Sequence, residues 1–259
     1  MTTAYDSIGK SYAATRGADP RITEQLLNLL DLPKGSKILD VGAGTGNYSF
    51  ALANAGYEVT AIEPSQVMRN QGKQHDQITW VEGTAEKLPF DSTSFDGAVM
   101  TLCMHHFSDW KLGMKEAARV TGNGPIIILT FDAFSNKIFW LFHYFPEFLE
   151  KDKNWFPKID NLKRYAKNEL SKKVEVHPFP LPHDLIDHFA SAGWARPEIY
   201  LEQLYRSGIS SFSSINPTSV DAGLLKLEQD LKSGEWDSKY GDLRKRRSLD
   251  TGYVFVKVL

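Results

Sequence analysis

The chain has 259 residues, 42% of them hydrophobic and 24% charged, which is long enough to bury the core of one large domain. Its 30 Lys and Arg residues against 32 Asp and Glu residues give a formal net charge of −2, which argues against a nucleic-acid binder that works by bulk electrostatics. A single cysteine, Cys103, excludes a disulfide framework and any multi-cysteine metal site. No apolar run has the roughly 20 residues of a membrane helix, and the start MTTAYDSIGK is not typical of a signal peptide. We therefore expect a cytoplasmic protein without a membrane partner.

Strand-like and helix-like segments alternate over the first half of the chain. Apolar residues at helical spacing predict a helix from Ile22 to Leu30. Short apolar runs predict strands at 37–41, 58–63, 78–83, 95–101 and 125–131, and helices are expected at 49–56, after Ser65, and around 110–120. Such alternation with short connections is typical of a parallel sheet covered by helices on both faces.

The alternation stops after Asp132. The 26 residues from Phe131 to Phe156 hold ten of the 31 aromatic residues. These rings predict a helical cap that buries its own aromatic side chains, the wall of a substrate pocket, or both together, and we expect Trp140 and Phe145 to take part in the pocket. A helix is expected at 183–194, a strand at 197–204, a helix at 217–233 and a last strand at 251–259. The chain then divides into a core at 1–131 and 183–259, a cap insertion at 132–182, and a second, smaller insertion at about 205–250.

A glycine-rich loop, DVGAGTG at 40–46, follows the first predicted strand and precedes a helix. Such a loop lets the backbone approach a ligand closely beneath the helix N-terminus. Its spacing is G-x-G-x-G, whereas the dinucleotide fingerprint requires glycine or alanine where this chain has Asn47. Glu63, at the end of the second predicted strand, is placed to accept hydrogen bonds from both hydroxyls of a ribose. A solvated acid at a strand end is the alternative.

Four motifs in this order resemble the class I S-adenosylmethionine-dependent methyltransferases, and in particular the branch known as methyltransferase type 11. They are the glycine loop, EPS at 63–65, GTAEKLPFDSTSFDGAVM at 83–100 and MHHF at 104–107. The resemblance covers about residues 1–131. It implies an α/β fold with a Rossmann-like, doubly wound, seven-stranded sheet that is mostly parallel and has an antiparallel last strand. It also implies S-adenosyl-L-methionine as the cofactor.

The resemblance further implies which residues bind that cofactor. In chain order they are Tyr5, Tyr12, Arg16, Asp40, Gly42, Ala43, Gly44, Gly46, Glu63, Pro64, Met68, Thr84, Ala85, Glu86, Thr101 and Leu102. In such enzymes the loop at 40–46 faces the methionine part, Glu63 holds the ribose, and 84–86 border the adenine. The segment at 5–16 is similar to an N-terminal lid that closes over the cofactor, and an ordinary amphipathic arm is the alternative.

His105 and His106 follow the fourth predicted strand, at the sheet edge where ligands bind in open α/β folds. We expect them as catalytic residues because a histidine there can take a proton from the acceptor atom. The alternative is that they only orient the loop. No metal site is expected.

These observations predict methyl transfer, by in-line displacement, to a small-molecule acceptor that is apolar or aromatic. The net charge, and the lack of an Asn/Asp-Pro-Pro-aromatic motif after the fourth strand, disfavour nucleic acid. A catalytically inactive S-adenosylmethionine-binding sensor or partner protein is one alternative, and an NAD(P)-dependent oxidoreductase is another. The acceptor, its reacting atom and the oligomeric state are left open by the sequence.

Overall fold

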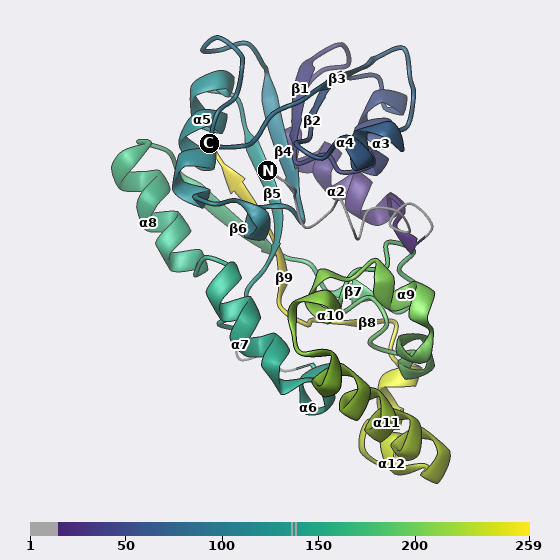
Figure 1. The fold of residues 1–259 in the computed structure, drawn as a ribbon. Helices are drawn as coiled ribbons and strands as arrows, with labels where there is room; N and C mark the ends of the chain where they lie inside the picture. Colours follow the sequence, from purple (N-terminus) through teal and green to yellow (C-terminus); the bar gives the residue numbers. More distant parts are fainter. Residues whose placement is uncertain (1–14, 136, 138) are drawn as a thin grey trace.

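The computed structural model describes residues 15–135, 137 and 139–259, and within them a seven-stranded sheet forms the centre of the fold (Figure 1). Its strands are β1 Lys37–Val41, β2 Glu58–Ile62, β3 Ile78–Val81, β4 Gly97–Thr101, β5 Ile126–Phe131, β6 Val174–Pro178 and β9 Tyr253–Val258. The strand order is β3-β2-β1-β4-β5-β9-β6. β9 is antiparallel to both of its neighbours, and the pairs from β3 to β5 are parallel. The predicted Rossmann-like fold with an antiparallel last strand is confirmed.

Helices cover both faces of this sheet. The helices α2 Pro20–Leu30 and α3 Asn47–Asn54 pack on one face, and α5 Trp110–Thr121 and α8 Ile159–Glu169 pack on the other. α2 illustrates why the sequence folds this way. Asp19 caps its first turn by accepting the backbone N–H of Arg21, and Asp31 ends the helix in the left-handed conformation. The apolar side of α2 buries Ile22 and Leu26 completely.

A group of helices lies beyond the carboxyl ends of the parallel strands (Figure 1), and we call it the cap. It consists of α6 Leu141–Tyr144, α7 Pro146–Trp155, the 3-10 helix η2 Pro197–Leu201, α9 Gln203–Ser207, α10 Ser210–Ser214, α11 Pro217–Ser233, α12 Glu235–Tyr240 and the 3-10 helix η3 Gly241–Lys245. A two-stranded ribbon of β7 Leu181–Pro182 and β8 Ser248–Leu249 accompanies it. Two further short elements, α4 Gln66–Asn70 and the 3-10 helix η1 Met104–His106, follow strands β2 and β4.

The cap has an aromatic core of its own. The Trp140 ring is 3% exposed, its Nε1–H donates to the Trp194 carbonyl at 2.8 Å, and its edge meets the Trp236 ring with a centroid distance of 5.4 Å. Phe145 is 1% exposed and packs against Phe148. Neither Trp140 nor Phe145 lines the two cavities described below. For these two rings the expectation of a pocket wall is wrong, because their neighbours are other cap side chains.

The second half of the chain differs from the prediction in two elements. Residues 183–194 form turns rather than a helix, and the strand expected at 197–204 is η2 followed by α9. The outer sheet strand is instead β6, inside the segment 132–182 that we assigned to the cap insertion. Helical apolar spacing misled the prediction at 183–194 because Asp187 is buried and Ile186 is 51% exposed. The division into core and cap stays a proposal, with β6 belonging to the sheet.

Candidate functional site

A cavity of about 640 Å³ opens at the carboxyl ends of β1, β2 and β4, and its volume is in the range of small-molecule sites. Thirteen of the expected cofactor residues line it: Arg16, Asp40, Gly42, Ala43, Gly44, Glu63, Pro64, Met68, Thr84, Ala85, Glu86, Thr101 and Leu102. Thr45, Asn47, Tyr48, Glu82, Gly83, Cys103, His106, Phe107, Ser108 and Asp187 complete the lining. Gly46 lies in the loop but not in the lining, and Tyr5 and Tyr12 lie outside the described residues.

The glycine loop turns back beneath the N-terminus of α3. Gly42, Gly44 and Gly46 have φ values of +69°, +59° and +71°, a conformation that side chains with a Cβ rarely adopt. The N–H of Gly42 donates to the Ile62 carbonyl at 2.9 Å, which ties the loop to the end of β2. A Cβ at Gly46 would lie 2.6 Å from a Trp80 ring carbon. Glycine is therefore required for the turn and also for the packing of the loop.

Glu63 joins this loop to the one after β2. Its side chain is 6% exposed, and its two carboxylate oxygens accept the backbone N–H groups of Gly44 at 3.0 Å and Ser65 at 2.9 Å. A carboxylate oxygen can accept more than one hydrogen bond, so these contacts orient the group and leave acceptor capacity for a ligand in the cavity. This geometry fits the binding of two ribose hydroxyls.

Asp40 places a second carboxylate in the wall. It is 2% exposed, and its Oδ2 accepts the Ser49 hydroxyl at 2.5 Å. Burial raises the pKa of Asp40 to about 6; the hydrogen bond from Ser49 opposes this shift, and the negative charge of Glu63 adds to it. Two acidic groups in one cavity favour a ligand that carries positive charge. S-adenosylmethionine carries positive charge on its ammonium and sulfonium groups, so it fits this pattern of acidic groups.

The expected adenine border has two kinds of residue. Thr84 and Ala85 line the cavity together with the buried Met68. Glu86 also reaches the cavity, but its Oε1 accepts the backbone N–H of Ser108 at 2.7 Å and the hydroxyl of the same residue at 2.9 Å. Glu86 therefore holds the loop after β4 in place, and its contact with a bound adenine stays a prediction.

Arg16 lines this cavity with its charge already paired. Its guanidinium donates two hydrogen bonds to the carboxylate of Asp187, one of them between Nη2 and Oδ2 at 3.2 Å. The Tyr48 hydroxyl donates to the same carboxylate at 2.9 Å. The expected pairing of Arg16 with the methionine carboxylate stays a prediction. Sequence reasoning missed Asp187 because it lies 171 residues from Arg16.

The two histidines face different spaces. His106 lines the large cavity and His105 lines a second cavity, with 3.8 Å between the ring centroids. Burial, and then the positive charge of Arg16, lowers the pKa of His106 to about 4. Burial, with His106 and Arg16 as smaller causes, lowers the pKa of His105 well below its usual range. Both rings are therefore neutral at pH 7, and proton uptake by either is unfavourable. A catalytic role for them stays a prediction, and the alternative, that they orient the loop, gains support.

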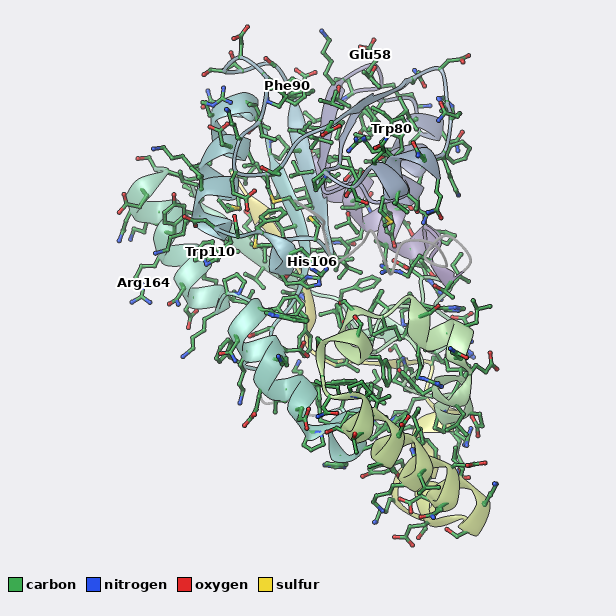
Figure 2. All side chains as sticks on the ribbon, viewed as in Figure 1. Glu58, Trp80, Phe90, His106, Trp110 and Arg164 are labelled. Atoms are coloured by element: carbon green, nitrogen blue, oxygen red, sulfur yellow. The ribbon has the colours of Figure 1, made fainter. Side chains whose placement is uncertain are left out.

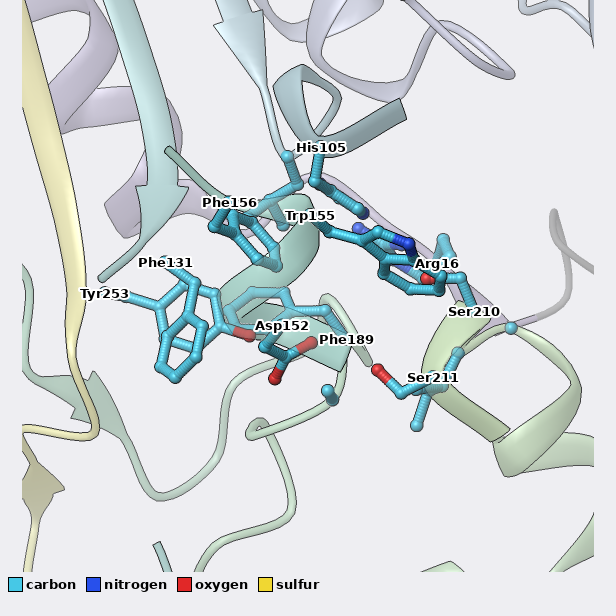
Figure 3. Close-up of a pocket in the computed structure, with 14 residues that line it drawn as sticks. Arg16, His105, Phe131, Asp152, Trp155, Phe156, Phe189, Ser210, Ser211 and Tyr253 are labelled. Atoms are coloured by element: carbon cyan, nitrogen blue, oxygen red, sulfur yellow. The ribbon is translucent and has the colours of Figure 1, made fainter. Parts of the chain in front are cut away.

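The second cavity, of about 50 Å³, adjoins the first because Arg16 and Leu102 line both. Leu102 has a φ of +54°, which is rare for a leucine and is the kind of strain found at functional sites. Figure 3 shows the other side chains around this space, which come from both sheet and cap. They are His105, Phe131, Asp152, Trp155, Phe156, Phe189, Ala190, Gly208, Ile209, Ser210, Ser211 and Tyr253. We therefore expect the acceptor next to Leu102, with Trp155 and Phe156 as the pocket rings that the cap supplies.

Metal binding and membrane spanning both require recognisable arrangements of residues. Among the described residues, no group of three or more His, Cys, Asp or Glu side chains is arranged to hold a metal ion. None of the helices in the described part of the chain is long and apolar enough to span a membrane.

Comparison with known proteins agrees with this geometry. Residues 39–129 match the family model of a methyltransferase domain. The demethylmenaquinone methyltransferase of Corynebacterium glutamicum is 34% identical over 129 residues, which are 48% of this chain and 56% of that protein. The chain thus matches little more than half the length of this curated relative. The enzyme of the same name from Renibacterium salmoninarum is 25% identical over 91% of this chain and 93% of its own length.

A solved structure resembles nearly the whole chain. It is a protein of Anabaena variabilis, described as a methyltransferase from an antibiotic biosynthesis pathway. It is 44% identical, the match covers 95% of this chain and 99% of that one, and the TM-score is 0.90. The chain belongs to the class I S-adenosylmethionine-dependent methyltransferase family.

Proposed function

We propose that the protein transfers a methyl group from S-adenosylmethionine to a small-molecule acceptor held between the sheet edge and the cap. The observation that carries this proposal is the junction of the two cavities at Leu102. The larger cavity has the carboxylates and glycine loop that suit the cofactor, and the smaller one is lined by rings. When bound, S-adenosylmethionine supplies a methyl group that is already activated by a cationic sulfur.

The residues of this chain have four tasks in such a reaction. Glu63 and the loop at 40–46 fix the cofactor, so that its position is set before the acceptor binds. Leu102 separates the two cavities and lies where the acceptor must approach. Trp155 and Phe156 exclude water from the approach path, which strengthens the electrostatic interactions inside. His105 and His106, as neutral rings, act by shape and orientation unless the acceptor itself changes their protonation.

The relatives support a small acceptor. The Corynebacterium glutamicum relative is named for a menaquinone precursor, which is a small molecule rather than a protein or a nucleic acid. The ring-lined cavity also suits an acceptor with an apolar part. The alternative of an inactive cofactor-binding sensor predicts cofactor binding without turnover, so binding and turnover have to be measured separately.

The first experiment is calorimetry with the demethylated cofactor product, S-adenosylhomocysteine. We expect micromolar binding to the wild type. Glu63→Ala should cost about 1.5–3 kcal/mol, or roughly tenfold to 150-fold in Kd, because two ribose hydroxyls lose a charged acceptor. Glu58→Ala is the matched control, since Glu58 begins the strand β2 that Glu63 follows, is exposed, and lies at the opposite end of the sheet from His106 (Figure 2).

Equal affinity of wild type and Glu63→Ala would contradict the ribose assignment. Turnover is then tested by incubating the protein with S-adenosylmethionine and a metabolite library, and by following formation of S-adenosylhomocysteine. Cofactor binding without any product across acceptor classes would favour the sensor.

A further inference from the structure

Asp152, on α7, is an acidic residue buried in the smaller cavity. It is 7% exposed, and its carboxylate lies among aromatic rings (Figure 3). Within the part of the chain that the structure describes, its side chain has no ion pair and no hydrogen bond. A buried carboxylate normally has a charged or hydrogen-bonding partner, because an unpaired one is costly to remove from water. The missing partner is the feature that needs an explanation.

The charges that face this cavity do not balance Asp152. The guanidinium of Arg16 is paired with Asp187, and the ring of His105 is held neutral by burial. The Tyr253 phenol is uncharged, since burial raises its pKa. Burial alone raises the pKa of Asp152 to about 7, so the acid is close to half ionised near neutral pH. A positively charged group of a bound molecule would balance the ionised form of Asp152.

The rings around Asp152 form a continuous wall. Phe156 stacks on His105 with centroids 4.5 Å apart and meets Phe131 at 5.6 Å, and Phe131 meets Tyr253 at 5.2 Å. The faces of aromatic rings attract cations, more strongly when water is excluded. Ser210 and Ser211, on α10, add neutral polar groups of the cap to this lining (Figure 3).

The size of the cavity limits what it can hold. One water needs about 10–15 Å³ of such space, so about 50 Å³ holds a group of roughly four heavy atoms. A whole aromatic ring does not fit, but the end group of a larger acceptor does.

We propose that Asp152 and the rings of Phe131, Phe156 and Tyr253 bind a small, positively charged nitrogen group of the methyl acceptor. This inference rests on the proposed function, because it takes the space beside Leu102 as the acceptor site. It narrows the substrate class to amines, whose charge Asp152 neutralises. Asp152 is thus a specificity-determining residue.

The test uses n-propylammonium and 1-propanol as probes, since both have four heavy atoms and differ in charge. The full-length protein carries aspartate labelled with ¹³C at the carboxyl carbon, and the Asp152 signal is assigned by its loss in Asp152→Asn. The pKa of Asp152 is measured with 50 mM of either probe, with and without S-adenosylhomocysteine. We expect propylammonium to lower that pKa by one unit or more, which is a tenfold preference for the ionised acid, and 1-propanol to leave it unchanged.

Binding of the probes to variants gives a second measure. Asp152→Asn keeps the shape of the side chain and removes the charge, and we expect it to bind propylammonium at least tenfold more weakly. Glu150→Gln, an exposed carboxylate on the same helix, should bind like the wild type. If Asp152→Asn does not fold, the signal is assigned by its loss in Asp152→Ser instead, and the wild-type titration then decides.

The outcomes separate this inference from the proposed function. An unchanged Asp152 pKa with propylammonium, or an equal effect of 1-propanol, overturns the amine site while binding of S-adenosylhomocysteine leaves the proposed function standing. Failure of S-adenosylhomocysteine to bind overturns the proposed function, whatever the probes do.

Discussion

The two cavities that meet at Leu102 are built in different ways. The larger one is made mainly by loops that follow strand ends of the sheet, and its wall sets two buried carboxylates, Asp40 and Glu63, among apolar side chains. The smaller one brings together sheet ends and cap segments, and its wall is mainly aromatic, with one unpaired carboxylate. The first is organised by local turns and the second by long-range packing.

This difference matters for function because a cofactor is constant and an acceptor varies. A site built from the loops of a shared sheet can stay the same among relatives, whereas a site built from an insertion can change with the substrate. The cap of this chain is thus the region in which specificity should be sought. The predictions that follow test whether cap and sheet contribute separately.

The largest expected effect concerns the cap core. Trp140→Ala removes a buried ring and its hydrogen bond to the Trp194 carbonyl, so we expect the free energy of unfolding to fall by about 3–5 kcal/mol. The affinity for S-adenosylhomocysteine should stay within about twofold. Urea unfolding measures the stability, and calorimetry measures the affinity.

Trp155→Ala is the matched comparison, because the half-buried Trp155 ring lines the smaller cavity. We expect this substitution to cost less stability than Trp140→Ala and to lower methyl transfer instead. The comparison fails if Trp140→Ala keeps full stability.

A smaller effect is expected from the glycine loop. Gly46→Ala forces a Cβ to within 2.6 Å of Trp80 at a φ of +71°, so it combines backbone strain with a collision. Gly35→Ala is the control, since its φ is +84° but a Cβ there would have no neighbour within 4 Å. Backbone strain alone should cost each variant about 1–2 kcal/mol. We expect a further loss, together with weaker binding of S-adenosylhomocysteine, only for Gly46→Ala. Equal behaviour of the two variants would show that the close approach to Trp80 is unimportant.

The local construction of the larger cavity explains why most residues that the sequence predicts for the cofactor site lie together in its lining. The strands at 37–41 and 126–131 are short apolar runs with short connections, and the glycine loop, Glu63 and the segment 84–86 follow strand ends directly. Because parallel strands end at one edge of the sheet, these residues meet once the alternation is recognised.

The smaller cavity could not be assembled in that way. Its side chains come from segments as distant as Arg16, Asp152 and Tyr253, and of the described residues that line it only His105 belongs to one of the four motifs. Whether Asp152 points inward depends on how α7 packs against the sheet edge, which periodicity does not determine. The same limit explains the errors at 183–194 and at β6. β6 is an outer strand with half-buried residues, so its apolar signal is weak.

The pH dependence of stability tests the unpaired acid of the cap. The folded-state pKa of Asp152 is about 7, above its ordinary value of roughly 3.9, so between these values the folded protein holds a proton that the unfolded chain has lost. Stability from this group is therefore present at low pH and is lost as pH rises toward 7. We expect Asp152→Asn, relative to wild type, to gain roughly 2 kcal/mol between pH 5 and pH 7 in urea unfolding. Parallel pH profiles of the two proteins would mean that Asp152 has a partner in solution.

The smallest expected effect is at the sheet side of the junction. The Thr101 hydroxyl is buried and lines the cofactor cavity, and among the described residues it has no hydrogen-bond partner. A buried polar group without a partner costs stability, so Thr101→Val, which keeps the shape, should leave the free energy of unfolding unchanged within about 0.5 kcal/mol or raise it slightly. If the hydroxyl instead binds the cofactor, S-adenosylhomocysteine should bind about threefold to tenfold more weakly to Thr101→Val, since one hydrogen bond is worth about 0.5–1.5 kcal/mol. Unchanged stability with weaker binding would mean that the sheet edge contributes to the cofactor site by side chains as well as by its loops. Unchanged binding would mean that the sheet edge contacts the cofactor through its backbone and through the carboxylates of Asp40 and Glu63. The sheet edge would then differ more clearly from the cap, where aromatic side chains form the wall.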